Sequence, residues 1–175
     1  MQFIPSSLSG AWLIEPEFRR DDRGGFARSW CSREFEQHGL DSRLVQCNIS
    51  TNGIQGTVRG MHFQRDPYAE TKLVRCTRGA ILDVIVDLRR ESSTCGQWVS
   101  FELSADNHRM LYIPAGLAHG FQTLMDDTEV FYQMSNEFQA GHSSGVHWND
   151  PSILVKWPLP ISRISIQDET WPAWK

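Results

Sequence analysis

The segment from Ala80 to Leu88 restricts the possible folds most strongly, because its side chains fall into two sets at alternating positions. Leu82, Val84, Val86 and Leu88 fall on one face, whereas Ile81, Asp83, Ile85 and Asp87 fall on the other. A period of two residues is typical of a β-strand, because successive side chains of a strand point to opposite sides. This segment therefore predicts a strand in a sheet.

Short segments of the same character, separated by turn signals, recur along the chain. Turns are indicated at Asn52-Gly53, Arg78-Gly79, Cys95-Gly96, Pro114-Ala115-Gly116 and Asp126-Asp127. Further strands are predicted over residues 44–50, 54–60, 72–77, 98–103, 109–113, 119–124 and 129–135. Many short strands at regular spacing predict an all-β sandwich or barrel.

Helical patterns are rare in this sequence. One helix is predicted over residues 32–38, with Ser32 as its cap and Gly39 as its stop signal, and a turn is predicted near Pro151. A second local prediction concerns the Asp126-Asp127 turn. If it closes a tight hairpin, His119 and Phe121 lie opposite Met134 and Tyr132, and His119 and Tyr132 both point into the barrel. A register slip of one residue would reverse that orientation.

Composition places the chain among ordinary globular proteins. It has 175 residues, of which 40% are hydrophobic and 22% charged, so we expect one domain over residues 1–175. The net charge of −4 argues against a nucleic-acid partner. We expect no membrane association and a cytoplasmic location, because there is no long apolar run and the N-terminus does not resemble a signal peptide. Cys31, Cys47, Cys76 and Cys95 are widely spaced, which favours free thiols over a metal site.

The segment Arg59-Gly60-Met61-His62-Phe63-Gln64 carries the clearest chemical signal, together with Lys72. A neutral imidazole such as that of His62 can accept a proton, and a nearby ammonium can stabilise the negative charge that remains. This pair suits removal of a proton next to a carbonyl group. An acid on the other side of the substrate would complete such a site, and Tyr132 is the candidate.

These motifs occur in an order that resembles the dTDP-4-dehydrorhamnose 3,5-epimerase family of the cupin superfamily. The matching segments are 22–26, 46–50, 58–64, 72–74, 79–84, 86–89, 113–121 and 148–151. The resemblance implies a cupin jelly-roll barrel, a homodimer in which an N-terminal strand of each chain helps to build the other chain's site, and no metal or other cofactor. The sequence agrees with the absence of a metal, since His62, His108 and His119 are scattered and no His-x-His motif occurs.

The resemblance also implies catalytic roles on a nucleotide-diphosphate 4-keto-6-deoxy sugar. His62 resembles the base, Asp168 the carboxylate that orients it, Lys72 the cation at the developing oxyanion, and Tyr132 the acid on the opposite face. Each has a structural alternative: a satisfied core histidine, a surface carboxylate, a solvated lysine on a strand edge, and a core tyrosine.

The same resemblance assigns substrate-binding residues. Arg23 and Arg59 resemble diphosphate contacts, Gln46 and Asn48 neutral contacts to the nucleotide, and Phe26 a surface on which a base stacks. His119 and Asp83 are expected in the polar wall of the pocket, where either residue can also be purely structural.

The chain departs from the family at positions that would face the nucleotide. Arg28 replaces a glutamate that accepts from the thymine ring N–H, Phe138 a tyrosine, Ser143 an acidic residue and Gln167 a lysine. Because a guanidinium cannot accept a hydrogen bond, Arg28 predicts the nucleotide order CDP, then GDP, then dTDP. The alternative is that Arg28 pairs with a surface carboxylate and leaves dTDP binding intact.

Several functions are compatible with these residues. The leading prediction is a metal-independent isomerase that inverts C3, C5 or both through an enolate. The alternatives are a C3-only or C5-only monoepimerase, a 4-keto to 3-keto sugar isomerase, and a non-catalytic nucleotide-sugar-binding cupin. Retention of Tyr132 together with the His62 motif argues against the keto-sugar isomerase.

Overall fold

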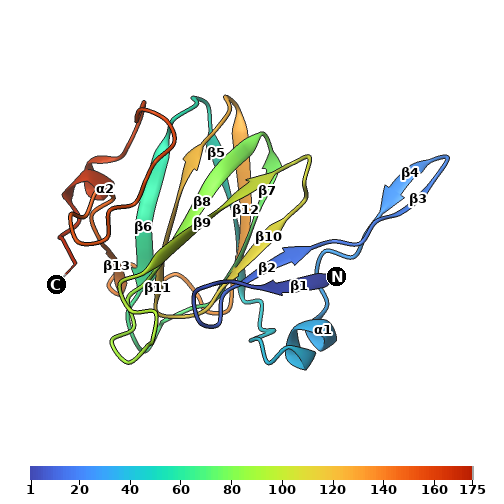
Figure 1. The fold of residues 1–175 in the computed structure, drawn as a ribbon, viewed down its shortest axis with the longest axis horizontal. Coiled ribbons are helices and arrows are strands. Elements are labelled where there is room, and N and C mark those ends of the chain that lie inside the picture. The colour runs from blue at the N-terminus through green and yellow to red at the C-terminus, as the bar shows by residue number, and fades with distance from the viewer. Residues whose placement is uncertain (175) are drawn as a thin grey trace.

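The computed structural model describes residues 1–174, which are built mainly of antiparallel sheets (Figure 1). The larger sheet has the order β1 (Gln2–Pro5), β2 (Trp12–Glu15), β10 (Met110–Ile113), β7 (Lys72–Arg78), β12 (Thr128–Met134) and β5 (Gln46–Asn52). The smaller sheet has the order β13 (Ser143–Gly145), β6 (Val58–Gln64), β11 (Leu117–Thr123), β8 (Ala80–Asp87) and β9 (Trp98–Ser104). A separate hairpin is formed by β3 (Arg19–Asp21) and β4 (Gly24–Phe26).

From β5 to β12 successive strands lie in opposite sheets, except that β8 and β9 are paired in the smaller sheet, and this order gives the jelly-roll arrangement. In the larger sheet β5, β12, β7 and β10 are neighbours, and in the smaller sheet β6, β11, β8 and β9 are neighbours. Both faces of β8 are largely buried, as expected for a strand that carries apolar residues on each face. Ile81 and Ile85 pack between the sheets, whereas Val84 and Val86 pack on the outer side against Val155 from the C-terminal segment. The predicted all-β jelly roll is confirmed.

The predicted hairpin at Asp126-Asp127 is wrong. Strand β11 pairs with β6 and β8, whereas β12 pairs with β5 and β7, so the chain crosses from one sheet to the other at this turn. Contacts with other turns stabilise the crossing: the Asp126 carboxylate accepts from the Gln55 backbone N–H, and the Asp127 carbonyl accepts from Arg78. His119 and Tyr132 still point into one space, because the two sheets face each other.

The helices are short. Helix α1 (Ser32–Gln37) matches the predicted segment, but Cys31 occupies its N-cap position and makes no side-chain capping bond to the described residues. Gly39 has φ +69° just after the helix, which is consistent with the predicted stop. Helix α2 (Ile166–Thr170) was not predicted. It begins where the Ser165 side chain accepts from the Asp168 backbone N–H.

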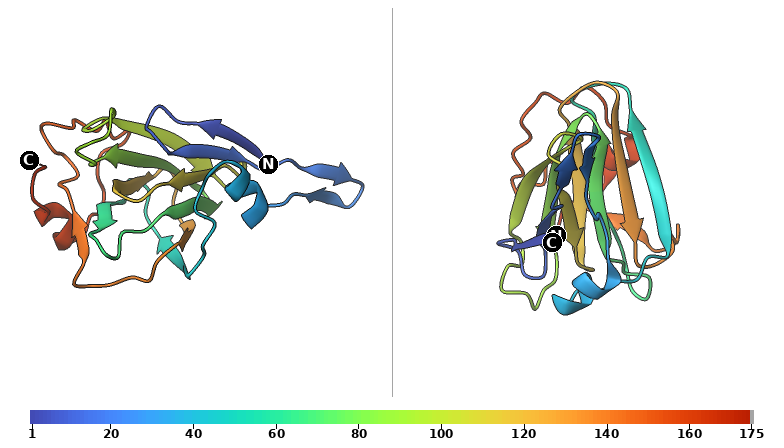
Figure 2. Two further views of the ribbon diagram at one scale, coloured as in Figure 1. Left: turned by 90° about the horizontal axis from the view of Figure 1, so that it is seen from below. Right: turned by 90° about the vertical axis from the view of Figure 1, so that its right-hand side faces the viewer.

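The ends of the structure lie far apart. The β3–β4 hairpin extends away from the sheets, and the C-terminal segment with α2 lies at the opposite end of the molecule beside β6 (Figures 1 and 2). Neither helix within residues 1–174 has the length and apolar character needed to cross a membrane. The hairpin residues are exposed along both strands, so the hairpin is not part of the chain's own core.

Candidate active site

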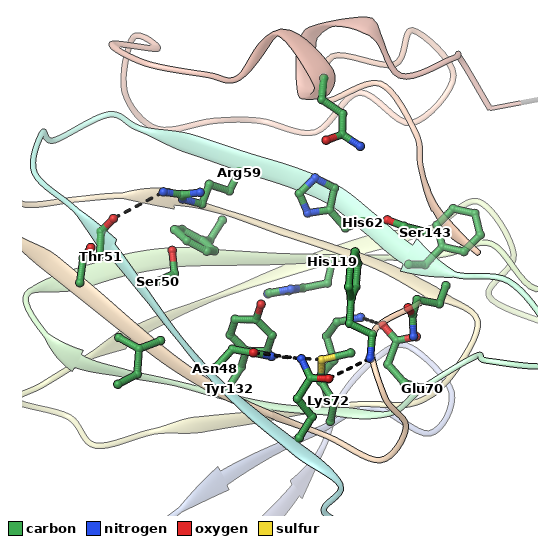
Figure 3. Close-up of a pocket in the computed structure, with 18 residues that line it drawn as sticks. Asn48, Ser50, Thr51, Arg59, His62, Glu70, Lys72, His119, Tyr132 and Ser143 are labelled. Carbon is green, nitrogen blue, oxygen red and sulfur yellow. Dashed lines mark hydrogen bonds and ion pairs between the residues drawn. The ribbon is translucent and has the colours of Figure 1, made fainter. Parts of the chain in front are cut away.

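A cavity of about 600 Å³ opens between the two sheets and gathers most of the predicted site residues (Figure 3). His62 and His119 enter it from β6 and β11 of the smaller sheet. Lys72 and Tyr132 enter it from β7 and β12 of the larger sheet. The predicted residues that line the cavity are Gln46, Asn48, Arg59, His62, Lys72, His119, Tyr132, Phe138, Ser143 and Gln167.

His62 is held by a buried carboxylate. Its Nε2 lies 2.6 Å from Oδ1 of Asp168, which is 4% exposed. Asp168 also accepts from the Gly60 backbone N–H at 3.2 Å and from the Trp171 indole N–H at 3.2 Å. Burial acts to raise the pKa of Asp168, but the bond to His62 and these other donors hold that pKa below its usual value. The carboxylate is therefore ionised and fixes the orientation of the His62 ring.

The local sequence explains how Asp168 arrives there. Ser165 starts α2, and the third residue after this cap carries its side chain toward β6. Trp171, just beyond the helix, packs so closely on Gly145 that an added Cβ there would lie 2.6 Å from the indole ring. The helix end is thus held by contacts with two neighbouring strands, β6 through Gly60 and β13 through Gly145, and these contacts hold Asp168 beside His62.

His119 has its own carboxylate partner. Its Nε2 lies 2.5 Å from Oδ1 of Asp83, a fully buried residue on β8. Burial raises the pKa of Asp83, and the contact with His119 offsets part of that rise. Asp83 lies behind His119 and is not among the residues that line the cavity. Of the two residues expected in the polar wall, His119 lines the cavity and Asp83 does not; Asp83 instead binds the His119 ring from behind.

Lys72 forms an ion pair with Glu70, a cavity residue that the sequence analysis did not identify. Both side chains are largely buried, with Lys72 9% and Glu70 6% exposed. Glu70 lies two residues before Lys72, the first residue of β7, and a spacing of two in extended backbone directs both side chains to the same side. That spacing was the signal available in the sequence.

Tyr132 faces the cavity from the sheet opposite His62 (Figure 3). Burial raises the pKa of its hydroxyl; the Arg59 guanidinium lowers that pKa in part, and the Glu70 carboxylate raises it further. The hydroxyl is thus protonated at neutral pH and able to donate. The arrangement places an imidazole and a phenol on opposing walls of one cavity.

Three further polar residues of the cavity are held by neighbours. Arg59 donates through Nε to the Asn52 side chain at 2.7 Å. Gln46 donates to Asn48 at 3.0 Å, and its carbonyl oxygen accepts from the backbone N–H of Phe138 at 2.9 Å. Further lining residues that sequence reasoning missed are Ile49, Ser50, Thr51, Phe63, Gln64, Phe121 and Met134. Most of them lie on strands beside predicted residues, so strand register could have revealed them.

Besides Asp83, three predicted binding residues do not reach this cavity. Arg23 lies in the hairpin and pairs with Asp21, and the Phe26 side chain beside it is 76% exposed. Arg28 donates to Glu34 of α1 at 2.6 Å. The structure therefore shows the surface ion pair that was the alternative reading of Arg28.

The polar groups of the cavity do not form a metal site. Within residues 1–174, no cluster of three or more His, Cys, Asp or Glu side chains has the arrangement needed to hold a metal ion. Each cavity histidine has its Nε2 directed at a carboxylate, and the other polar residues of the cavity include the Lys72–Glu70 ion pair, Arg59, Tyr132 and neutral amides. This donor set suits proton transfer beside a cation.

The chain is similar to known proteins over nearly its whole length. The family model described as dTDP-4-dehydrorhamnose 3,5-epimerase matches residues 5–175. A dTDP-4-dehydrorhamnose 3,5-epimerase of Sinorhizobium fredii is 46% identical over 99% of this chain and 89% of its own length. The crystal structure of the Bacillus anthracis enzyme of that name, with TDP and PPi bound, superposes with a TM-score of 0.95 at 44% identity over 98% of both chains.

A third comparison concerns the number of inverted carbons. ChmJ from Streptomyces bikiniensis, a 3'-monoepimerase in complex with dTDP-quinovose, has a TM-score of 0.90 at 33% identity, over 98% of this chain and 86% of that chain. Its likeness shows that this fold also serves single inversions. The chain belongs to the dTDP-4-dehydrorhamnose 3,5-epimerase family and is an isomerase of the epimerase type.

Proposed function

We propose that the chain inverts C3 and C5 of a dTDP-linked 4-keto-6-deoxyhexose through an enolate. His62 removes the proton next to the ketone, and Asp168 holds its ring. The electron pair of the broken C–H bond moves onto the ketone oxygen, where Lys72 stabilises the charge. Tyr132 then protonates the same carbon from the other face, and exchange with solvent restores His62 and Tyr132 to their starting states.

The observation that carries this proposal is the placement of His62 and Tyr132 on opposing walls of one cavity, with Lys72 beside them. A base alone would return the proton to the face from which it came and retain the configuration. Inversion needs a donor on the far face, and the Tyr132 hydroxyl can supply it. The same arrangement argues against a protein that only binds the sugar nucleotide.

For the nucleotide we propose dTDP. The ion pair of Arg28 with Glu34 removes the reason for ranking CDP and GDP first, because this guanidinium already has an acceptor outside the cavity. TDP and dTDP-quinovose in related structures support the same choice. Comparative binding of dTDP, CDP and GDP by calorimetry tests it. Clearly tightest binding of CDP or GDP would restore the order predicted from the sequence.

Solvent deuterium exchange tests the reaction itself. The purified protein is incubated in D₂O with dTDP-4-keto-6-deoxyglucose, and the sugar is analysed by NMR. Label at both C3 and C5 with inverted product supports the double epimerase. Label at C3 alone would favour a monoepimerase, the activity named for the similar protein ChmJ. Absence of label at both carbons would leave a binding protein as the remaining function.

We further propose that the chain works as a homodimer in which the hairpin of β3 and β4 reaches the partner's cavity. The position of Arg23 and Phe26 supports this proposal, because both residues lie on the exposed hairpin away from the cavity of their own chain. In a dimer they could bind substrate in the partner's cavity. Mixing two inactive variants, His62→Asn and Arg23→Ala, tests it. A mixed dimer contains one cavity with both an intact His62 and an intact hairpin from the partner. Activity should therefore reappear on mixing, and persistent inactivity would contradict the exchange.

A further inference from the structure

Glu70 has an unused acceptor at the cavity. One carboxylate oxygen, Oε1, pairs with the Lys72 ammonium, whereas Oε2 is buried and makes no hydrogen bond to any part of residues 1–174. The residue is 6% exposed and lines the cavity (Figure 3). A buried carboxylate oxygen without a donor is costly, since it has lost its water and gained nothing in return. A ligand that brings a donor to this oxygen would remove that cost.

The pair of Glu70 and Lys72 has a defined polarity. Glu70 lies just before β7 and Lys72 begins this strand, so the pair offers an acceptor next to a donor within one cavity. An α-hydroxyketone offers the complementary pair, because its hydroxyl donates and its neighbouring ketone oxygen accepts. In a 4-keto-6-deoxyhexose the ketone has one hydroxyl on an adjacent carbon, at C3, whereas C5 carries the methyl group and the ring oxygen.

We propose that Glu70 is a specificity-determining residue that accepts a hydrogen bond from the C3 hydroxyl of the sugar while Lys72 meets the C4 oxygen. This rests on the proposed function and identifies the sugar class further: substrates with a donor at C3 next to the ketone. The interaction also suits the enolate formed from C3, in which the C3 hydroxyl and the C4 oxygen are coplanar neighbours. Glu70 and Lys72 then bind the two oxygens as a pair.

A simpler role for Glu70, as counter-ion to Lys72 alone, makes a different prediction. Loss of a counter-ion would impair all substrates equally, since every one of them has the ketone. Loss of a hydroxyl acceptor would impair only substrates that carry the C3 hydroxyl. The two roles are therefore separated by a substrate that keeps the ketone and the C5 proton but lacks that hydroxyl.

The experiment compares deuterium exchange at C5 for dTDP-4-keto-6-deoxyglucose and its 3-deoxy analogue. The wild-type protein should prefer the hydroxylated substrate roughly ten- to hundredfold in kcat/KM, the range expected for a hydrogen bond to a charged group. Glu70→Ala should reduce this preference to about twofold or less, since it removes the acceptor. Glu70→Gln keeps a neutral acceptor of the same shape and should give an intermediate preference. Glu137→Gln, at an exposed glutamate, is the matched control.

Several outcomes overturn the proposal. They are a wild-type protein without preference, a Glu70→Ala variant with undiminished preference, and equal losses on both substrates. If Glu70→Ala does not fold, Glu70→Gln decides by the same ratio. Binding of dTDP, which lacks the 4-keto-6-deoxyhexose, should be unchanged in every folded variant. Absence of exchange with both substrates in the wild type would instead reject the proposed epimerase function.

Discussion

His62 and His119 are direct cross-strand partners on β6 and β11, and each imidazole is bonded to a different buried carboxylate. The two carboxylates differ in environment. Asp168 accepts from three donors, and its pKa is lowered, whereas burial dominates at Asp83 and its pKa is raised. The two carboxylates that bind the cavity histidines thus have pKa values shifted in opposite directions.

Replacement of Asp168 by Asn should reduce kcat by roughly 10²–10⁴-fold, the range of a general-base contribution, because His62 loses the carboxylate that orients its ring. The dTDP affinity should stay within about threefold of the wild-type value. Steady-state kinetics with the 4-keto sugar nucleotide measure both. Glu169→Gln, at the exposed neighbouring position of α2, is the control and should retain full activity. Near-normal kcat in Asp168→Asn would remove the carboxylate from the mechanism.

Replacement of Tyr132 by Phe should separate proton removal from inversion. His62 and Lys72 remain, so solvent deuterium still enters the sugar, but the hydroxyl that donates on the far face is lost. Formation of inverted product should fall by about 10²-fold or more, while exchange falls much less. NMR of the sugar in D₂O follows both quantities in one sample. Equal losses of exchange and inversion would contradict the assignment of Tyr132 as the acid.

Asp87 should make the stability of the fold depend on acid pH. Its buried carboxylate accepts from Arg89, Ser92 and Thr94, and although burial acts in the opposite direction, these donors lower its pKa strongly. A lowered folded-state pKa stabilises the fold above the unfolded value, near about pH 4, and this stabilisation is lost as the pH falls further. Asp87→Asn should therefore cost about 2–4 kcal/mol of unfolding free energy at pH 7.

The measurement for Asp87 is urea unfolding of wild type and variant between about pH 3 and pH 7. The free-energy difference should be constant above about pH 5 and should shrink below about pH 4. Asp106→Asn, at an exposed aspartate outside this network, should show little difference at either pH. A difference that stays constant down to pH 3 would show that the Asp87 charge is not responsible.

Gly60 should not tolerate a side chain. Its φ is +137°, and an added Cβ would lie 2.5 Å from the Gly120 Cα on the neighbouring strand. Gly60→Ala should cost about 2–5 kcal/mol, combining backbone strain with overpacking, and should lower activity by displacing His62 two residues away. Gly53→Ala is the matched control, because a Cβ there has open space. Thermal unfolding compares them, and equal stability of the two variants would contradict the predicted clash.

Local sequence patterns predicted most strands of the jelly roll. The segment predicted over residues 54–60 forms strand only from Val58, however, and β1 to β4 and β13 were not predicted. Residues 80–88 alternate strictly, and the strand matches that pattern because both of its faces are buried by apolar neighbours. The motif around His62 and the position of Lys72 likewise identified two walls of one cavity. Helix α2 escaped prediction because so short a helix has almost no periodic signal, and its position depends on contacts with β6.

The sequence by itself determined the family, the β-barrel fold and the proposed reacting groups: an imidazole, an ammonium, a phenol and a carboxylate. Only the tertiary structure decided their relations. It brought Asp168 to His62 across 106 residues, left Glu70 with a free oxygen beside Lys72, and gave Arg28 a partner in Glu34. The physical reason is that strand formation depends on local periodicity, whereas pairing of charges depends on which distant segments are packed together and shielded from water.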